Sequence, residues 1–352
     1  MRRTTIIAGV TAAAMTLAGV VQGQTHAPWP TDWNNWNDPA LWCTVGDPGN
    51  VGDTRYPDTT FGIPSYGAVP YTYKIGKFEV TAGQYTAFLN AVAARDTYAL
   101  YNSNMDTAVY PYGCNIKRTG SSGSFTYNVA PDYANRPVNF VSWGDAARFV
   151  NWLTNGQLAG AQDASTTEDG SYYLNGATLN ADLMAVTRKT NAKYVIPTED
   201  EWYKAAYYKG GSTNAGYWTY PTRSNAAPGA SMADAAGNNA NYGHSWDQPI
   251  DSGKNTTEVG EFQNSPGPYG TFDQGGNVEE LNETAAGGIY RGQRGGLFNG
   301  DSNYMHVINK AYHVPTYQQI NIGFRVAAVP EPVTFFILFG AVPILSGRKR
   351  RK

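Results

Sequence analysis

Cys43 and Cys114 carry the most reactive side chains of this 352-residue chain, and they are its only cysteines. Neither belongs to a C-x-x-C motif or lies beside a cationic cluster that would lower the pKa of its thiol. A redox-active pair is therefore the less favoured interpretation. Because the N-terminal segment directs the chain to an oxidising compartment, we expect a structural disulfide between Cys43 and Cys114. Such a bond stabilises the fold by about 4 kcal/mol in the chain-entropy model.

The four histidines do not form a metal-binding pattern. His26, His244, His306 and His313 share no spacing such as H-x-x-x-H, so the sequence does not predict zinc. The signatures of other common active sites, namely G-x-S-x-G, the P-loop and the dinucleotide-binding fingerprint, do not occur in the chain.

Both ends of the chain have the character of targeting signals. Arg2 and Arg3 precede an apolar run over residues 4–21, which predicts a secretory signal peptide over residues 1–23. At the other end, Pro330, Glu331 and Pro332 are followed by an apolar stretch over 333–345 and five basic residues over 348–352. A membrane-spanning helix needs roughly 20 apolar residues, so this short stretch fits a transient anchor better than a permanent one.

The order of motif, apolar segment and basic tail resembles the PEP-CTERM sorting signal of Gram-negative bacteria. The resemblance implies that an exosortase recognises residues 329–352 after a transient stay in the inner membrane. The mature chain is then expected in the cell envelope, on the outer surface or in the extracellular matrix. An ordinary C-terminal anchor is the alternative interpretation.

Charge excludes one large class of function. Without both signals the chain has 19 Lys and Arg against 27 Asp and Glu, a net charge of −8. Nucleic-acid binding needs basic side chains that displace counterions from phosphates, and this acidic chain has no basic run outside the signals. Divalent cations, by contrast, suit an acidic surface.

Periodicity predicts a few regular elements in a chain rich in Gly, Tyr and Trp. We expect a strand over 71–80, a helix from the cap Thr81 to about residue 95, and a helix from the cap Ser142 to Leu153. A short strand over 194–197 leads to a helix that starts at a capping box of Thr198 and Glu201. Residues 25–70, 101–136 and 155–193 show no sustained pattern. The sequence therefore predicts an α+β fold with little regular secondary structure.

Six sequence blocks occur in the order of the formylglycine-generating enzymes, also called sulfatase-modifying factors, and the chain resembles that family. The blocks are KFEVTAGQYTAFLNAV (77–92), RPVNFVSWGDAARFVNWL (136–153), YVIPTEDEWYKAA (194–206), YGTFDQGGNVEE (269–280), RGG (294–296) and GFRVA (323–327). The resemblance implies a variant of the C-type-lectin-like fold over residues 68–328, preceded by an N-terminal extension over 24–67. Trp143 and Trp202 are expected to anchor its core, and Arg325 is expected to be a paired structural arginine.

Active members of this family oxidise a target cysteine with two cysteines that follow the RGG block and bind copper(I) as thiolates. In this chain those positions correspond to Gly300 and Met305. Glycine offers no ligand, and one thioether does not replace two thiolates. The resemblance therefore implies no catalytic residue here, and copper is not expected.

The calcium sites of the family are expected to be retained. The resemblance assigns the first site to the side chains of Asp273 and Glu280 and the carbonyl groups of Gly276 and Val278. A second site would use the side chains of Asn241 and Asp251 and the carbonyl groups of Tyr242 and Gly253. These oxygen ligands suit a hard cation. Carboxylates that accept hydrogen bonds from loop N–H groups are the structural alternative.

Three functions remain open at this stage. The favoured one is a non-catalytic, calcium-stabilised binding or matrix module whose loops contact polysaccharide or protein, with the binding face near 297–306. An enzyme of the formylglycine-generating type that has diverged, an oxidoreductase acting on a sulfatase cysteine, is the alternative. A purely structural envelope component is the third.

Overall fold

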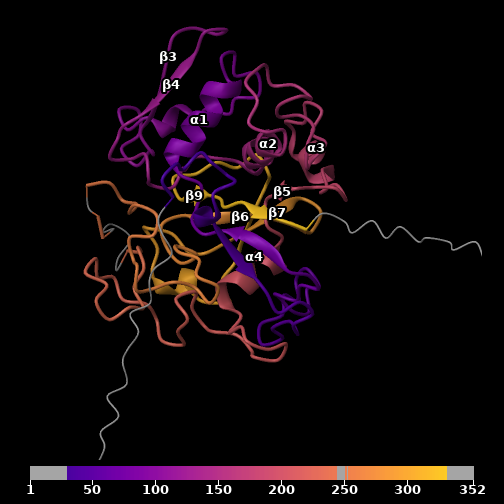
Figure 1. Ribbon diagram of the computed structural model, residues 1–352, viewed down its shortest axis with the longest axis vertical. Helices are drawn as coiled ribbons and strands as arrows, with labels where there is room; N and C mark the ends of the chain where they lie inside the picture. The colour runs from indigo at the N-terminus through magenta and orange to yellow at the C-terminus, as the bar shows by residue number, and fades with distance from the viewer. Residues whose placement is uncertain (1–29, 244–249, 252, 331–352) are drawn as a thin grey trace, which may run out of the picture.

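The computed structural model of the protein describes residues 30–243, 250–251 and 253–330 (Figure 1). The predicted signal peptide over 1–23 and the sorting signal from Glu331 onward, including its apolar stretch, lie outside the described residues. Within the described residues, no helix has the length and apolar character needed to cross a membrane.

Three helices begin at the caps that the sequence predicts, and each cap forms a capping box, which the sequence predicted only for Thr198. Thr81 caps α1 (Ala82–Val92), Ser142 caps α2 (Trp143–Thr154) and Thr198 caps α4 (Glu199–Tyr207). In each case the cap side chain accepts a hydrogen bond from the backbone N–H three residues later, and the side chain of that residue bonds back to the cap. The predicted helix starts are confirmed, and α1 ends at Val92, three residues before its expected end.

The strands form two four-stranded sheets and a separate hairpin. The first sheet has the order β1 (Trp42–Val45), β2 (Tyr73–Gly76), β10 (Ala327–Ala328) and β5 (Tyr194–Val195), all antiparallel. The second has the order β8 (Ala311–His313), β7 (Tyr290–Arg294), β6 (Glu279–Ala286) and β9 (Ile322–Gly323), with β6 and β9 parallel. The hairpin joins β3 (Ile116–Thr119) to β4 (Thr126–Val129). In Figure 1 the hairpin and helices α1, α2 and α3 (Asn180–Ala185) lie above the central strands, and α4 lies below.

Aromatic side chains supply much of the core. Trp143 and Trp202 are fully buried, which confirms their predicted role as anchors. The main cluster includes side chains of α1, α2 and the first sheet, and a second cluster gathers around Trp202. Only short regular elements separate long loops, so the predicted mixed α and β fold with little regular secondary structure is confirmed.

Some elements arise where the sequence shows no sustained pattern. These are β1, the β3–β4 hairpin, helix α3 and three short 3-10 helices, η1 (Pro39–Leu41), η2 (Ser103–Met105) and η3 (Ser302–Met305). The expected strand over 71–80 is shorter and covers only Tyr73–Gly76.

The structure corrects the expectation for the two cysteines. Cys43 and Cys114 are both buried free thiols, so the predicted disulfide is not present in it. Each has different surroundings: Cys43 lies in β1 near Gly270, whereas the N–H of Cys114 donates to the side chain of Asn139. No disulfide therefore links these two parts of the core.

Candidate functional site

The segment over 297–306 follows the RGG block and is packed against two glycine-bearing motifs. Met305 is fully buried, in a small cluster with Tyr220, Ala240 and Tyr242. A Cβ atom at Gly296 would lie 2.6 Å from Met305 Cγ, and one at Gly275 would lie 3.3 Å from Met305 Sδ. Both glycines therefore leave space for the methionine side chain. Its thioether is buried and packed against them.

Gly300 occupies the other position of interest. A Cβ atom at this residue would lie 2.8 Å from Tyr304 Cδ2 and 2.9 Å from Leu297 Cγ, closer than side-chain carbons approach one another. A cysteine at this position would require the loop to shift. The structure thus brings Gly300 and Met305 into one short segment but offers no thiolate there.

The two thiols elsewhere do not replace the missing pair. Burial raises the pKa of Cys43 to about 11, against the smaller opposing effects of Lys77 and Arg325. Burial also raises the pKa of Cys114 to about 11. A thiol with so high a pKa holds its proton at neutral pH and is a poor ligand for a soft metal.

Glu280, a predicted calcium ligand, belongs to a fully buried ion pair. Its two carboxylate oxygens accept hydrogen bonds from Arg325, with 2.5 Å between Arg325 Nη2 and Glu280 Oε1, and one oxygen also accepts from Trp202 Nε1 at 2.7 Å. Both partners of the pair are 0% exposed. The expectation that Arg325 is a paired structural arginine is confirmed, and Glu280 already has three donors.

Two further carboxyl groups lie near this pair. Burial is the largest cause that raises the pKa of Glu79, and the charges of Asp273 and Glu280 raise it further. Burial also raises the pKa of Asp273 to about 7. Glu79 accepts hydrogen bonds from Asn277 Nδ2 at 3.1 Å and from the N–H of Val278 at 3.3 Å. Three carboxyl groups therefore share one guanidinium in the interior, and a cation would balance their charge.

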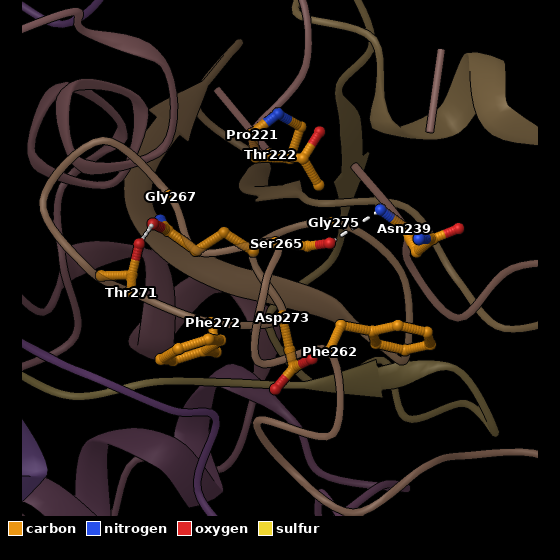
Figure 2. A pocket seen from close by; sticks show the side chains of 11 residues that line it. Pro221, Thr222, Asn239, Phe262, Ser265, Gly267, Thr271, Phe272, Asp273 and Gly275 are labelled. Atoms are coloured by element: carbon orange, nitrogen blue, oxygen red, sulfur yellow. Dashed lines mark hydrogen bonds between the residues drawn. The ribbon is translucent and has the colours of Figure 1, made fainter. Parts of the chain in front are cut away.

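Asp273 lines a small cavity of about 10 Å³, close to the volume that one water molecule needs (Figure 2). Figure 2 shows its carboxylate in the same pocket as Phe262 and Phe272. One oxygen, Asp273 Oδ2, accepts a hydrogen bond from the N–H of Gly260 at 2.5 Å. The cavity is large enough for a single bound water or ion and too small for an organic substrate.

The two predicted calcium-binding loops lie side by side. Asn241 pairs with Gly276 through a β-bridge, and a Cβ atom at Gly276 would lie 2.2 Å from Asn241 O. Only glycine, here with a φ of +90°, allows this approach. The oxygen Asn241 Oδ1 is buried and has no hydrogen-bond donor among the described residues. An orphaned buried acceptor fits a cation that would supply its missing partner.

Asp251, the carboxylate assigned to the second calcium site, has a partner of another kind. Its Oδ2 accepts from Arg136 Nη2 at 2.9 Å, and its side chain is 29% exposed. The carbonyl group of Asp251 accepts from the N–H of Asn255, whose own carbonyl accepts from Asn241 Nδ2 at 2.9 Å. Asp251 and Asn241 are thus linked through Asn255.

The histidines that the structure describes are placed among aromatic rings. His306 contacts Tyr56 and Tyr220 edge to face, and His313 stacks on Tyr317 with 4.3 Å between ring centroids. Within residues 30–243, 250–251 and 253–330, no group of three or more His, Cys, Asp or Glu side chains could hold a metal ion. That finding does not test a site built from two side chains and backbone carbonyl groups.

Glu79 is the site residue that sequence reasoning missed. It belongs to the first of the six blocks, but nothing in the alternation of a strand distinguishes an inward carboxylate from a solvated one. The signal that could have found it is the residue pattern Phe78-Glu79-Val80, in which a charged residue stands between two apolar ones shortly after β2 and before the cap of α1.

Comparison with known proteins identifies the family. The sulfatase-modifying factor enzyme 1-like domain matches residues 51–329. A search of curated proteins gives no significant match. Among solved structures, Treponema denticola variable protein 1 is 22% identical with a TM-score of 0.51, covering 82% of this chain and 95% of that one. This likeness supports the fold alone.

Two other solved structures are similar to the chain at lower TM-scores. CarF is 22% identical with a TM-score of 0.49, over 82% of this chain and 98% of its own. PvdO from Pseudomonas aeruginosa is 19% identical with a TM-score of 0.44, over 82% of this chain and 90% of its own.

Proposed function

We propose a non-catalytic function for this chain, which belongs to the sulfatase-modifying factor enzyme 1-like family. It is an exported binding or matrix module of the cell envelope or extracellular matrix, with a C-type-lectin-like surface for polysaccharide or protein. The observation that carries the proposal is the state of the segment over 297–306. There Gly300 has no space for a side chain and the thioether of Met305 is buried in packing.

Export and sorting in this proposal depend on the two ends of the sequence. The signal peptide over 1–23 takes the chain across the inner membrane, and the segment over 329–352 holds it there until an exosortase acts on the motif of Pro330, Glu331 and Pro332. The net charge of the mature chain keeps it soluble and away from anionic lipid.

Calcium is the proposed cofactor, with a stabilising role. Asn241 Oδ1 supplies an acceptor that lacks a donor, and Asp273 supplies a carboxylate beside an ion-sized cavity. Asp251 and the carbonyl groups of Tyr242, Gly253, Gly276 and Val278 would complete the two sites. A bound cation would favour the ionised forms of Glu79 and Asp273, whose pKa values burial raises, and would hold the two loops together.

The proposed ligand-binding surface includes the exposed part of the segment over 297–306. Asp301 and Asn303 are exposed there, and His306 lies half-buried between Tyr56 and Tyr220. Aromatic rings stack on sugar rings, and amide and carboxylate groups bond to hydroxyl groups. The surface therefore suits a hydroxyl-rich ligand.

Two experiments on the full-length chain test this proposal. Fractionation of the producing cells should find the protein in the envelope or outside the cell, and a glycan array should show bound polysaccharides. A protein that stays in the cytoplasm and binds no glycan or envelope protein would contradict it.

The family match favours one other candidate, a diverged oxidoreductase of the formylglycine-generating type. It would have to use ligands other than the thiols of Cys43 and Cys114, because burial raises the pKa of both.

A further inference from the structure

The outer face of the first sheet holds a groove of about 440 Å³, which is much larger than the cavity beside Asp273. Four aromatic residues line it, namely Trp36, Trp42, Tyr73 and Tyr194. Trp42 stacks on Tyr194 with 5.7 Å between ring centroids and an interplanar angle of 19°. We infer that this groove binds an acidic polysaccharide, whose sugar rings pack on the aromatic side chains and whose carboxylates pair with Lys74 and Lys193.

The register of the sheet explains why these side chains share one face. Thr44 of β1 pairs with Lys74 of β2, which pairs with Ala328 of β10, which pairs with Tyr194 of β5. Residues paired in this way point to the same side of a sheet. The neighbouring residues Val45, Ile75 and Val195 are completely buried on the opposite, core-facing side. Thr44, Lys74 and Ala328 in this row are small or flexible, so they leave space above the sheet.

Charge within the groove is opposite to that of the molecule. Lys74 and Lys193 line it and are exposed, and among the described residues its lining includes no Asp or Glu, although the mature chain has an excess of acidic residues. Lys74 makes no ion pair with any described residue, and Lys193 lies over the ring of Tyr194 at 5.1 Å. A local positive field on an acidic protein selects an anionic ligand.

A buried donor supplies a second, independent observation. The indole nitrogen Trp36 Nε1 is buried in a side chain that is only 6% exposed, and it has no acceptor among the described residues. Buried N–H groups without an acceptor are rare, because each costs free energy. Trp36 also lines the groove, so a movement of its side chain that exposes this donor would let a sugar oxygen accept from it.

The groove is built partly outside the segment that matches the family. Trp36 and Trp42 precede the family match over 51–329, and Pro330 at the other end of the groove follows it. This site therefore goes beyond the function proposed above, which concerns the segment over 297–306. Sugar rings are favoured over a peptide strand as the occupant, since the lining of the groove crosses the face of the sheet over all four strands instead of following one strand edge.

Binding of the full-length chain to a galacturonic acid oligomer, followed by calorimetry at low salt, tests the inference. A neutral galactose oligomer of the same length serves as the uncharged comparison. The unsubstituted protein should bind the acidic oligomer at least tenfold more tightly than the neutral one. The double substitution Lys74→Glu and Lys193→Glu should weaken binding of the acidic oligomer by about tenfold or more, because it replaces two attractive charges with repulsive ones.

The matched control is the double substitution Lys117→Glu and Lys209→Glu, which changes the net charge equally at exposed residues outside the groove. Lys209 also lies over an aromatic ring, that of Trp218, at 4.9 Å. This control should bind with affinity within about threefold of the unsubstituted protein. Trp36→Phe, which removes the indole donor and keeps a smaller aromatic ring, should weaken binding severalfold, and thermal melts should show that all variants are folded.

Equal weakening in both double variants would overturn the inference, as would an acidic oligomer that binds no better than the neutral one. If the chain binds polysaccharide and the groove variants bind as tightly as the unsubstituted protein, the inference about the groove is wrong. The proposed binding surface near 297–306 is then retained. If neither oligomer binds, the inference about the groove is wrong, and the surface near 297–306 is tested separately by the glycan array and by binding of envelope proteins.

Discussion

Met305 and Trp42 are both large side chains, yet their surroundings are opposite. Met305 is completely buried, and glycines at positions 275 and 296 leave space that its side chain fills. Trp42 is half-exposed and lines an open groove of about 440 Å³. The side chain of Met305 is therefore enclosed by packing, whereas the groove, whose lining lies partly before and partly within the family match, is open to solvent.

We infer from this difference that the interior around Met305 stabilises the fold and that the groove binds ligand. Substitutions in the closed interior should change the free energy of unfolding, and substitutions in the groove should change ligand affinity instead. The expected role of the interior in stability can be tested by substitution, by removal of calcium and by a change of pH.

The largest effect is expected for Arg325→Met. The substitution leaves Glu280 buried without its guanidinium, next to the carboxyl groups of Glu79 and Asp273, and should destabilise the protein by about 3 to 5 kcal/mol. Chemical denaturation measures this loss. Arg118→Ala is the control, because Arg118 is 33% exposed and its pair with Asp96 should contribute about 1 kcal/mol or less. Similar losses in both variants would contradict the account.

Met305→Ala should cost about 2 to 4 kcal/mol, since it leaves a cavity among Gly275, Gly296 and the surrounding aromatic rings. Met305→Leu conserves the volume and removes the sulfur, and should cost less than about 1.5 kcal/mol. The midpoint of urea unfolding distinguishes the two. A large loss with leucine would show that the sulfur has a role besides packing.

Calcium should stabilise the chain by about 2 to 3 kcal/mol at a concentration 100 times its dissociation constant. The measurement is the melting temperature with calcium and with a chelator. Asn241→Ala should reduce this shift, because it removes the orphaned acceptor Asn241 Oδ1. Asn191→Ala, at an exposed residue, is the control and should retain the full shift. A shift that Asn241→Ala leaves unchanged would place calcium elsewhere.

The smallest effect concerns Asp200, at the start of α4. Burial raises its pKa to about 6, so the folded protein holds this proton more tightly than the unfolded chain, where Asp has a pKa of about 3.9. The stability from this group is complete below about pH 4 and is lost as pH rises through 6. Asp200→Asn should thus be about 1 to 2 kcal/mol more stable than the unsubstituted protein at pH 7.5, with little difference at pH 4.

Unfolding at the two pH values tests this prediction. The N–H of Gly67 donates a hydrogen bond to Asp200 Oδ1 at 2.7 Å in the unsubstituted protein. The side-chain amide oxygen that Asp200→Asn introduces can still accept this bond, so packing is preserved. A stability difference that is the same at both pH values would rule out titration as its cause.

Local signals in the sequence were sufficient for helices α1, α2 and α4, but not for α3. The caps at Thr81, Ser142 and Thr198 depend on residues three positions apart, and all three are confirmed. Strand β1 could not be predicted in this way, because Trp42–Val45 is a strand only through its pairing with Tyr73–Gly76. Long-range pairing of this kind leaves no local pattern.

The candidate site shows the same limit. The sequence predicted a paired Arg325, which is confirmed, but not that its partner is Glu280, which had been assigned to calcium. Residue types identify which side chains carry charge, while the choice among several buried partners depends on distances that only the fold sets. The disulfide expectation failed for this reason, since the two thiols lie in different surroundings.

The most direct test of the central claim is an assay of the purified protein with copper(I), oxygen and a cysteine-containing sulfatase peptide. We predict no formylglycine aldehyde in the peptide by mass spectrometry, because Gly300 and Met305 supply no thiolate where relatives bind copper. Catalytic formation of the aldehyde would contradict the account.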